Sequence, residues 1–193
     1  MPALVQDDVR NPARQGRPVR LMFQDAACFG CISNPRRCWA PPGVRPVVGA
    51  PVIRQYTDAF AAVSPHDGML DALILPQANR QRMSLFLQEV ARRHPEEFVL
   101  MVLDGAGGHR ATHFVILPQL HLIDLPLYRP ELNPAEHLWD EIREKWFPNR
   151  LFHDVSTVED VLEDALRTLE KDPARVFGLA GFEWVVNRPL NAI

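Results

Sequence analysis

Three acidic side chains stand within or beside segments where a charge needs a partner. Asp25 interrupts the apolar run 21–29, Asp104 ends the apolar run 98–103, and Glu136 lies in the first turn of a predicted helix. An ionised Asp in an apolar strand is costly unless it is paired or holds a metal. The positions of these acids therefore favour a site for a cation.

Converging carboxylates would form an oxygen-rich, anionic pocket suited to hard divalent cations such as Mg²⁺ or Mn²⁺. Two such ions, roughly 3.5–4 Å apart, can activate an attacking water or 3′-hydroxyl and stabilise the leaving oxygen of a phosphodiester. The protein then supplies mostly positioning and charge neutralisation. We expect Asp25 and Asp104 to share the two metals and Glu136 to complete one site.

Other interpretations of these and neighbouring residues carry no catalysis. An Asp at a strand end is usually a cap or turn residue, and a first-turn acid such as Glu136 is favoured by the helix dipole. His109 and His113 are four residues apart and could bind a transition metal from one helix face. No Cys or acidic ligand accompanies them at a known spacing, so a structural role is favoured for His113.

The cysteines form an odd, clustered set: Cys28, Cys31 and Cys38. Without a secretory signal this set does not describe a disulfide framework, so reduced thiols are expected. A zinc site would need a fourth ligand, and no second C-x-x-C supplies one. Incidental cysteines are the favoured interpretation.

The elements that must position the acids follow from apolar periodicity and breaker residues. Strands are expected at 21–29, 46–53, 56–63, 69–75, 98–104 and 120–127. Helices are expected at 80–94 after the N-cap Asn79, around 109–114, from Asn133-Pro134 to about 146, and at 158–171. On the third of these helices, Glu141 and Lys145 have the spacing of an ion pair. The order predicts an α/β fold with a mixed central sheet, three antiparallel strands followed by parallel strands, flanked by helices. That order is also the order of the ribonuclease-H-like fold.

Length and composition fit one domain with short extensions: a tail at 1–19, a body at 20–185 and a tail at 186–193. No apolar run could span a bilayer and no signal peptide is evident, so a cytoplasmic protein is expected. The net charge is −3, yet residues 1–54 carry eight Arg against three Asp. An Arg-rich half could face a phosphate backbone, although a GC-rich genome would give the same bias.

One segment, 125–139, resembles the signature of DDE transposases in the Tc/mariner superfamily, and most of all the bacterial insertion-sequence branch. Its sequence is L-P-L-Y-R-P-E-L-N-P-A-E-H-L-W, against a family pattern of approximately L-P-x-Y-x-P-x-L-N-P-x-E-x-x-W. The segment 102–109, V-L-D-G-A-G-G-H, is similar to the second family block. Residues 23–30 and 39–43 resemble the first block and the W-x-x-x-G region after it. The likeness covers about residues 20–185.

This resemblance implies that Asp25, Asp104 and Glu136 match the catalytic, metal-binding triad. His109 matches a position near the active site, and Asn133 matches the residue that fixes the loop before Glu136. Also implied are two Mg²⁺ (or Mn²⁺) ions, a ribonuclease-H-like fold, and cleavage and strand transfer on double-stranded DNA at transposon ends and target. A homodimer is expected, in the bacterial cytoplasm and nucleoid-associated when bound to DNA.

Two departures from the family pattern keep an alternative open. The first block usually has the sequence D-E-A-R-F-G, whereas this chain has Ala26 and Cys28 in place of the Glu and the Arg. A helix-turn-helix region is also missing, and an upstream polypeptide is expected to supply it. An inactive or truncated remnant, acting as a non-enzymatic binding module, would have both features. A nuclease of the same fold acting on branched DNA or RNA hybrids is a third hypothesis, which the string 131–136 disfavours.

Overall fold

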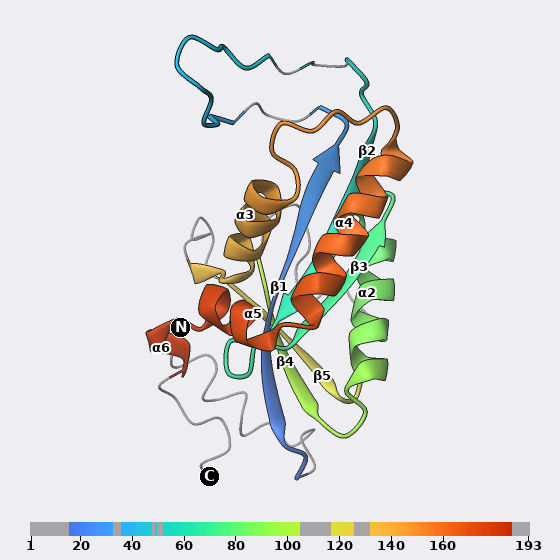
Figure 1. Cartoon of the computed structure of the whole chain (residues 1–193). Helices are drawn as coiled ribbons and strands as arrows, with labels where there is room; N and C mark the ends of the chain where they lie inside the picture. Colours follow the sequence, from blue (N-terminus) through green and yellow to red (C-terminus); the bar gives the residue numbers. More distant parts are fainter. Residues whose placement is uncertain are drawn as a thin grey trace.

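The computed structural model describes residues 16–32, 36–47, 49, 52–104, 117–125 and 132–186. These residues form a mixed sheet in the order β3-β2-β1-β4-β5. The strands are β1 (Val19–Gly30), β2 (Tyr56–Val63), β3 (Leu70–Leu75), β4 (Phe98–Leu103) and β5 (Leu120–Asp124). β1 pairs antiparallel with β2, and β2 with β3, whereas β4 runs parallel to β1 and to β5 (Figure 1). The predicted mixed sheet and its ribonuclease-H-like strand order are confirmed.

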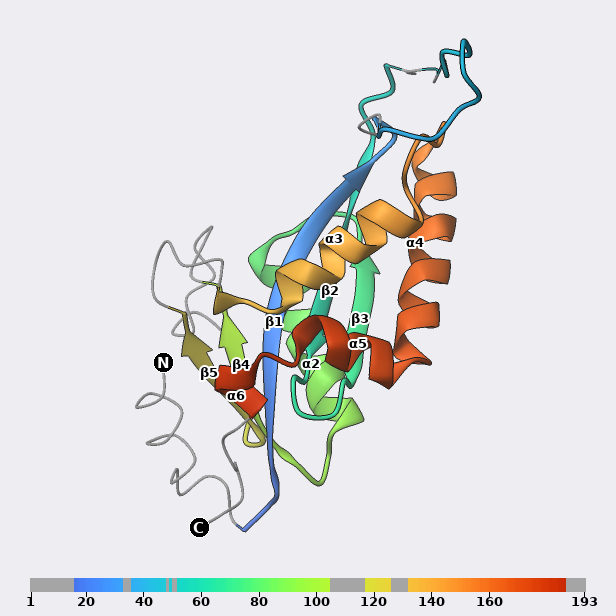
Figure 2. The same cartoon turned by 60° about the vertical axis from the view of Figure 1, so that its left-hand side comes forward.

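Helices cover both faces of the sheet, as Figures 1 and 2 show. They are α2 (Arg80–Arg93), α3 (Ala135–Lys145), α4 (Val155–Glu170), α5 (Pro173–Ala180) and α6 (Glu183–Val186). α2 begins at the predicted N-cap, because the Asn79 side chain accepts a hydrogen bond from the Arg82 amide at 3.0 Å. α5 and α6 were not expected from the sequence. No helix among the described residues is both long and apolar enough to cross a membrane.

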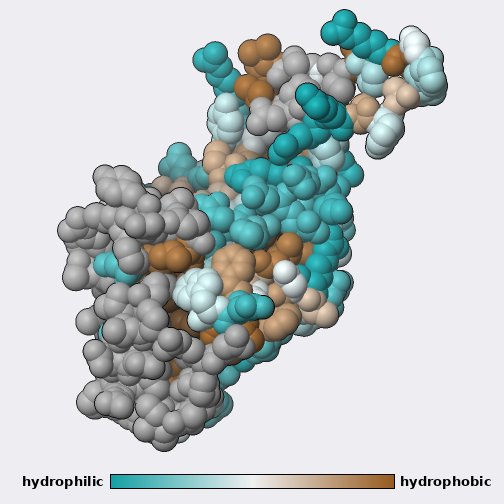
Figure 3. Space-filling view, turned by 90° about the vertical axis from the view of Figure 1, so that its left-hand side faces the viewer, coloured by the Kyte–Doolittle hydropathy of each residue, from teal (hydrophilic) through white to brown (hydrophobic). Residues whose placement is uncertain are grey.

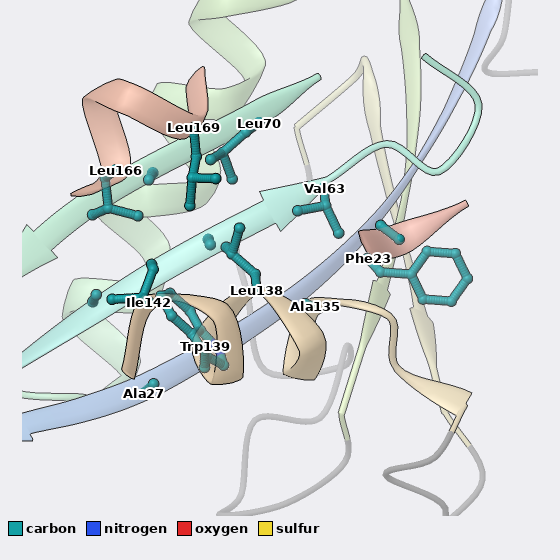
Figure 4. Packing of buried hydrophobic residues seen from close by; sticks show 14 of the residues in the cluster. Phe23, Ala27, Val63, Leu70, Ala135, Leu138, Trp139, Ile142, Leu166 and Leu169 are labelled. Carbon is teal, nitrogen blue, oxygen red and sulfur yellow. The ribbon is translucent and has the colours of Figure 1, made fainter. Parts of the chain in front are cut away.

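The central strand β1 sends alternate side chains to two apolar clusters. Phe23 and Ala27 face the larger cluster, where α3 contributes Trp139, which has no exposed surface. Figure 4 shows α3 and α4 packed over β1, β2 and β3 on this face. Met22 faces the smaller cluster under α2, whose members include Phe86. A residue's place in the strand therefore decides which helices it meets.

A long connection between β1 and β2, here called the arm (residues 31–55), leaves the body beyond the end of β1 (Figures 1 and 2). The strand expected at 46–53 is wrong for its described residues, 46, 47, 49, 52 and 53, none of which is in a strand. Pro46 and Pro51 have no amide hydrogen for a ladder. Trp39 is fully exposed (103%) and Val47 nearly so (92%), whereas Ile53, at the end of the arm, is partly buried against the larger cluster.

Several element ends differ from the sequence predictions. α3 begins at Ala135 with Pro134 as its N-cap, one residue later than expected. The expected ion pair along α3 is replaced by a tertiary pair, because Glu141 Oε1 accepts two hydrogen bonds from Arg175 of α5. The helix expected at 109–114 and the end of the strand expected at 120–127 lie outside the described residues.

A charged cluster joins the starts of β1, β3 and β4 to the end of α2, at the end of β1 away from the arm. Buried His94 contacts Asp71 Oδ2 through Nε2 at 2.7 Å and Glu97 Oε2 through Nδ1 at 2.8 Å. Arg20 binds the same Glu97 carboxylate at 2.5 Å and Asp67 at 2.7 Å. The hydrogen bond to Asp71 is the main cause that raises the pKa of His94 above 6.5.

Candidate active site

Asp25 and Asp104 lie on neighbouring parallel strands. The register pairs Gln24 of β1 with Leu103, the last residue of β4. Continuing this register by one residue sets Asp104 beside Asp25, at an interstrand spacing of about 5 Å. Both acids follow residues of the larger cluster by two, namely Phe23 and Val102. Alternation along a strand therefore directs both carboxylates to the face that α3 covers.

The N-terminal end of α3 is fastened to this part of β1. Asn133 Nδ2 donates a hydrogen bond to the Gln24 carbonyl at 3.1 Å, and Asn133 Oδ1 accepts one from the Ala135 amide at 3.2 Å. One turn further, the Trp139 indole Nε1 donates to Asp25 Oδ2 at 2.9 Å. Glu136 precedes Trp139 by three residues and so projects from the same side of α3. These bonds hold Glu136 over the strand that carries Asp25.

The charges of the other two acids act on the ionisation of Asp25. Burial raises the pKa of Asp25 to about 7, and the charges of Glu136 and Asp104 add to the rise. The Ala26 amide and the Trp139 indole oppose it by hydrogen bonding to the ionised form. Burial also raises the pKa of Glu136, which the Arg143 guanidinium lowers and the charges of Asp140 and Asp104 raise further. The site therefore holds more negative charge than its surroundings neutralise.

This excess of negative charge is what a divalent cation would relieve. The donor set is three carboxylates, which suits the hard ions Mg²⁺ and Mn²⁺. The Trp139 indole binds Asp25 Oδ2 and so fixes the orientation of this carboxylate. Among the described residues, the three acids included, no three acidic, His or Cys side chains stand close enough together to hold a metal ion. The residues fit the predicted ions in type and charge, and their side chains would have to move closer together to bind one.

Other residues named from the sequence fall outside this cluster. His109 and His113 lie outside the described residues. Cys28, Cys31 and Cys38 are free thiols, and only Cys31 is buried. The contacts of Trp139 with Asp25 and of Asn133 with Gln24 join residues more than 100 positions apart. The family pattern named Trp139 and Asn133 as motif residues, but it did not give their partners.

Comparison with known proteins gives this arrangement a family. The profile described as DDE superfamily endonuclease matches residues 20–159, well over half of the chain. The chain belongs to the DDE superfamily endonucleases. This DDE superfamily member is 30% identical over 126 residues to the uncharacterized protein y4pE/y4sA of Sinorhizobium fredii. The matched stretch covers 65% of this chain and 93% of the Sinorhizobium protein.

Solved structures share the fold of this DDE superfamily member. The Mos1 mariner paired-end complex with Mn matches at a TM-score of 0.59 and 14% identity, over 92% of this chain and 57% of that one. The Mos1 strand transfer complex matches at a TM-score of 0.55 and 16% identity, over 94% of this chain and 59% of that one. The DDE superfamily member thus spans about three fifths of the length of the Mos1 chains. At these identities the likeness establishes the ribonuclease-H-like fold.

Proposed function

We propose that this DDE superfamily member is the catalytic domain of a DNA transposase of the bacterial insertion-sequence branch of the Tc/mariner superfamily. In this proposal Asp25, Asp104 and Glu136 are the catalytic residues and hold two Mg²⁺ or Mn²⁺ ions. The observation that carries it is geometric: the β1–β4 register, continued by one residue, sets Asp104 beside Asp25, and α3, which carries Glu136, is bonded to β1 through Trp139. The charges of Glu136 and Asp104, which lie 111 and 79 residues away along the chain, both raise the pKa of Asp25.

Each side chain has a distinct task in this proposal. The Trp139 indole donates a hydrogen bond to Asp25 Oδ2, which fixes the orientation of the Asp25 carboxylate. The hydrogen bond from Asn133 to Gln24 fixes the start of α3 against β1, and this contact sets the position of Glu136 relative to the sheet. Bound divalent ions would activate the attacking water or 3′-hydroxyl and stabilise the leaving oxygen. Because Asp25 has a pKa of about 7, its proton must leave before the carboxylate can act as a ligand.

The substrate in this proposal is double-stranded DNA at the ends of an insertion sequence, followed by a target DNA. A homodimer in the bacterial cytoplasm, joined by an upstream helix-turn-helix polypeptide, completes the assembly. The relative from Sinorhizobium fredii supports a bacterial setting. The Mos1 matches, a paired-end complex and a strand transfer complex, support action on DNA ends by a fold of this type.

Strand cleavage of nicked and end-bearing duplex oligonucleotides with Mn²⁺ tests the proposal. We expect the wild-type chain to cut and Asp104→Asn to lose more than about 100-fold, because even outer partners of metal ligands cost 10–100-fold. Asp160→Asn on the exposed surface of α4 removes the same charge and should keep full activity.

Absence of cleavage by the wild-type chain with any divalent metal would favour the non-enzymatic binding module instead. Ala26, where the family pattern has Glu, packs against the apolar cluster under α2, so this departure removes no charge from the sheet face that carries the acids.

A further inference from the structure

A second polar site lies next to the acids, where the end of β1 meets the second half of α3 and the start of the arm. A cavity of about 150 Å³ opens there, here called the β1-end pocket. The wall residues that matter for the argument are Cys28 and Phe29 of β1, Arg36 of the arm, and Arg143 of α3. β4 ends opposite Gln24, so β1 continues from Asp25 to Gly30 without a β4 partner. Figure 3 shows the side of the molecule that carries α3, with hydrophilic residues gathered below the arm.

Two Arg side chains line this pocket. Arg143 is half-buried, and its Cζ lies 5.3 Å from the centroid of the Phe29 ring. Arg36 is exposed, and its backbone is anchored because its amide donates to Asn149 Oδ1 at 2.9 Å. Neither guanidinium forms an ion pair with another residue in the described part of the chain. Their positive charges are therefore available to a ligand.

The charge around the pocket favours an anion. Burial is the main cause that raises the pKa of the Cys28 thiol, and the nearby Asp58 carboxylate adds to the rise. Asp58 Oδ2 is already engaged by the Ala78 amide at 2.6 Å. Among the described residues of the pocket wall, two are Arg and none is acidic. Because guanidinium forks match phosphate oxygens in geometry, this lining favours a phosphate.

The pocket lies a short and definite distance from the three acids. Arg143 follows Glu136 by seven residues, about 10 Å along α3. Cys28 follows Asp25 by three residues, about 10 Å along β1. The charge of Arg143 also reaches Glu136, whose pKa it lowers. A duplex carries one phosphate per strand for about every 3.4 Å of its axis, and phosphates that wind around the axis are farther apart than this rise, so the span corresponds to at most about three nucleotides.

We propose that the β1-end pocket binds one backbone phosphate of the DNA strand, within about three nucleotides of the phosphodiester at the acids, with Arg143 and Arg36 as its ligands. This inference rests on the proposed function. It assigns a binding role to two residues outside the acid triad. It also explains how the chain replaces the Arg of the family's first block, since Cys28 at that position lines the same pocket.

Binding of a labelled DNA duplex to the full chain, measured by fluorescence anisotropy in EDTA over a series of salt concentrations, tests the pocket without catalysis. Loss of one phosphate contact lowers the slope of log K against log salt by about 0.9, which is about eight-fold in affinity at 0.1 M salt. We expect this result for Arg143→Met, which keeps the apolar packing on Phe29, and for Arg36→Met. Arg143→Lys should keep the slope, because it keeps the charge. Arg92→Met on α2, across the sheet, is the matched control and should leave the slope unchanged.

A methylphosphonate scan then locates the contact. Neutralising one phosphate at a time should weaken wild-type binding most at one position within about three nucleotides of the cut, and Arg143→Met should be insensitive there. The pocket is refuted if Arg143→Met and Arg36→Met keep the wild-type slope, if Arg92→Met changes it equally, or if the wild-type chain binds no DNA. If the wild-type chain cleaves DNA and the two Arg variants keep the wild-type salt slope, the phosphate pocket is refuted and the proposed function stands. If the two variants have reduced slopes but the wild-type chain does not cleave DNA, the phosphate pocket stands and the proposed catalytic function is refuted.

Discussion

Asp25→Asn should make the protein more stable at neutral pH, because folding places an ionisable group where its charge is opposed. Folding raises the pKa of Asp25 from an ordinary value of 3.8 to about 7. A group whose pKa is raised binds more protons in the folded state, so stability falls as pH rises between these two values. Each pKa unit is worth about 1.4 kcal/mol, so the cost of an ionised Asp25 reaches about 4 kcal/mol above pH 7. At pH 5 only about 2 kcal/mol of it is present.

The assay is urea unfolding of the wild-type chain and Asp25→Asn at pH 5 and pH 8, without divalent metal. Asparagine keeps an oxygen that can accept the Trp139 indole hydrogen bond, so the substitution removes the charge and little else. We expect the gain in the free energy of unfolding to be larger at pH 8 than at pH 5 by about 2 kcal/mol. Asp160→Asn, on the exposed surface of α4, should show no such difference.

Divalent metal gives the same experiment a second measurement. A cation that binds only the folded protein stabilises it according to its concentration and affinity. Mn²⁺ at pH 8 should therefore raise the free energy of unfolding of the wild-type chain and reduce the difference in this quantity between the wild-type chain and Asp25→Asn. A gain for Asp25→Asn that is equal at both pH values would refute the assigned pKa. An equal response of both proteins to Mn²⁺ would refute Asp25 as a metal ligand.

Two further predictions concern partners that the tertiary structure supplies. Trp139→Phe removes a hydrogen bond to ionised Asp25, worth about 1.5–3 kcal/mol, so the acidic limb of the pH profile of cleavage should move up by about one to two pH units. Trp146→Phe, on the same helix, should leave that limb in place. His94→Gln breaks a buried pair with Asp71 and should cost about 3 kcal/mol below pH 6.5. Because the pKa of His94 is raised, that stabilisation is lost as pH rises through the folded value, so the difference between the two proteins in urea unfolding should shrink toward pH 9. A constant difference would contradict a charged His94.

The sequence by itself predicted most of the strands and helices and pointed to the three acids. The apolar runs at 21–29 and 98–103 favour buried strands, and the structure has β1 and β4 there. The helix from Asn79 could be placed from one side-chain cap and a 3.6-residue apolar period. The family pattern added which acids to consider, because their order along the chain is a property of sequence.

Only the tertiary structure decided what those elements contact. Whether Glu136 reaches Asp25 depends on where α3 crosses β1, and that crossing is set by Trp139 and Asn133 against a strand over 100 residues away. The same reason explains two sequence predictions that failed. Glu141 pairs with Arg175 of α5 rather than with a residue of its own helix. The described residues of the segment 46–53 in the arm are not part of the sheet. Local patterns report the propensity of a segment, whereas burial, pairing and pKa depend on segments that only folding brings together.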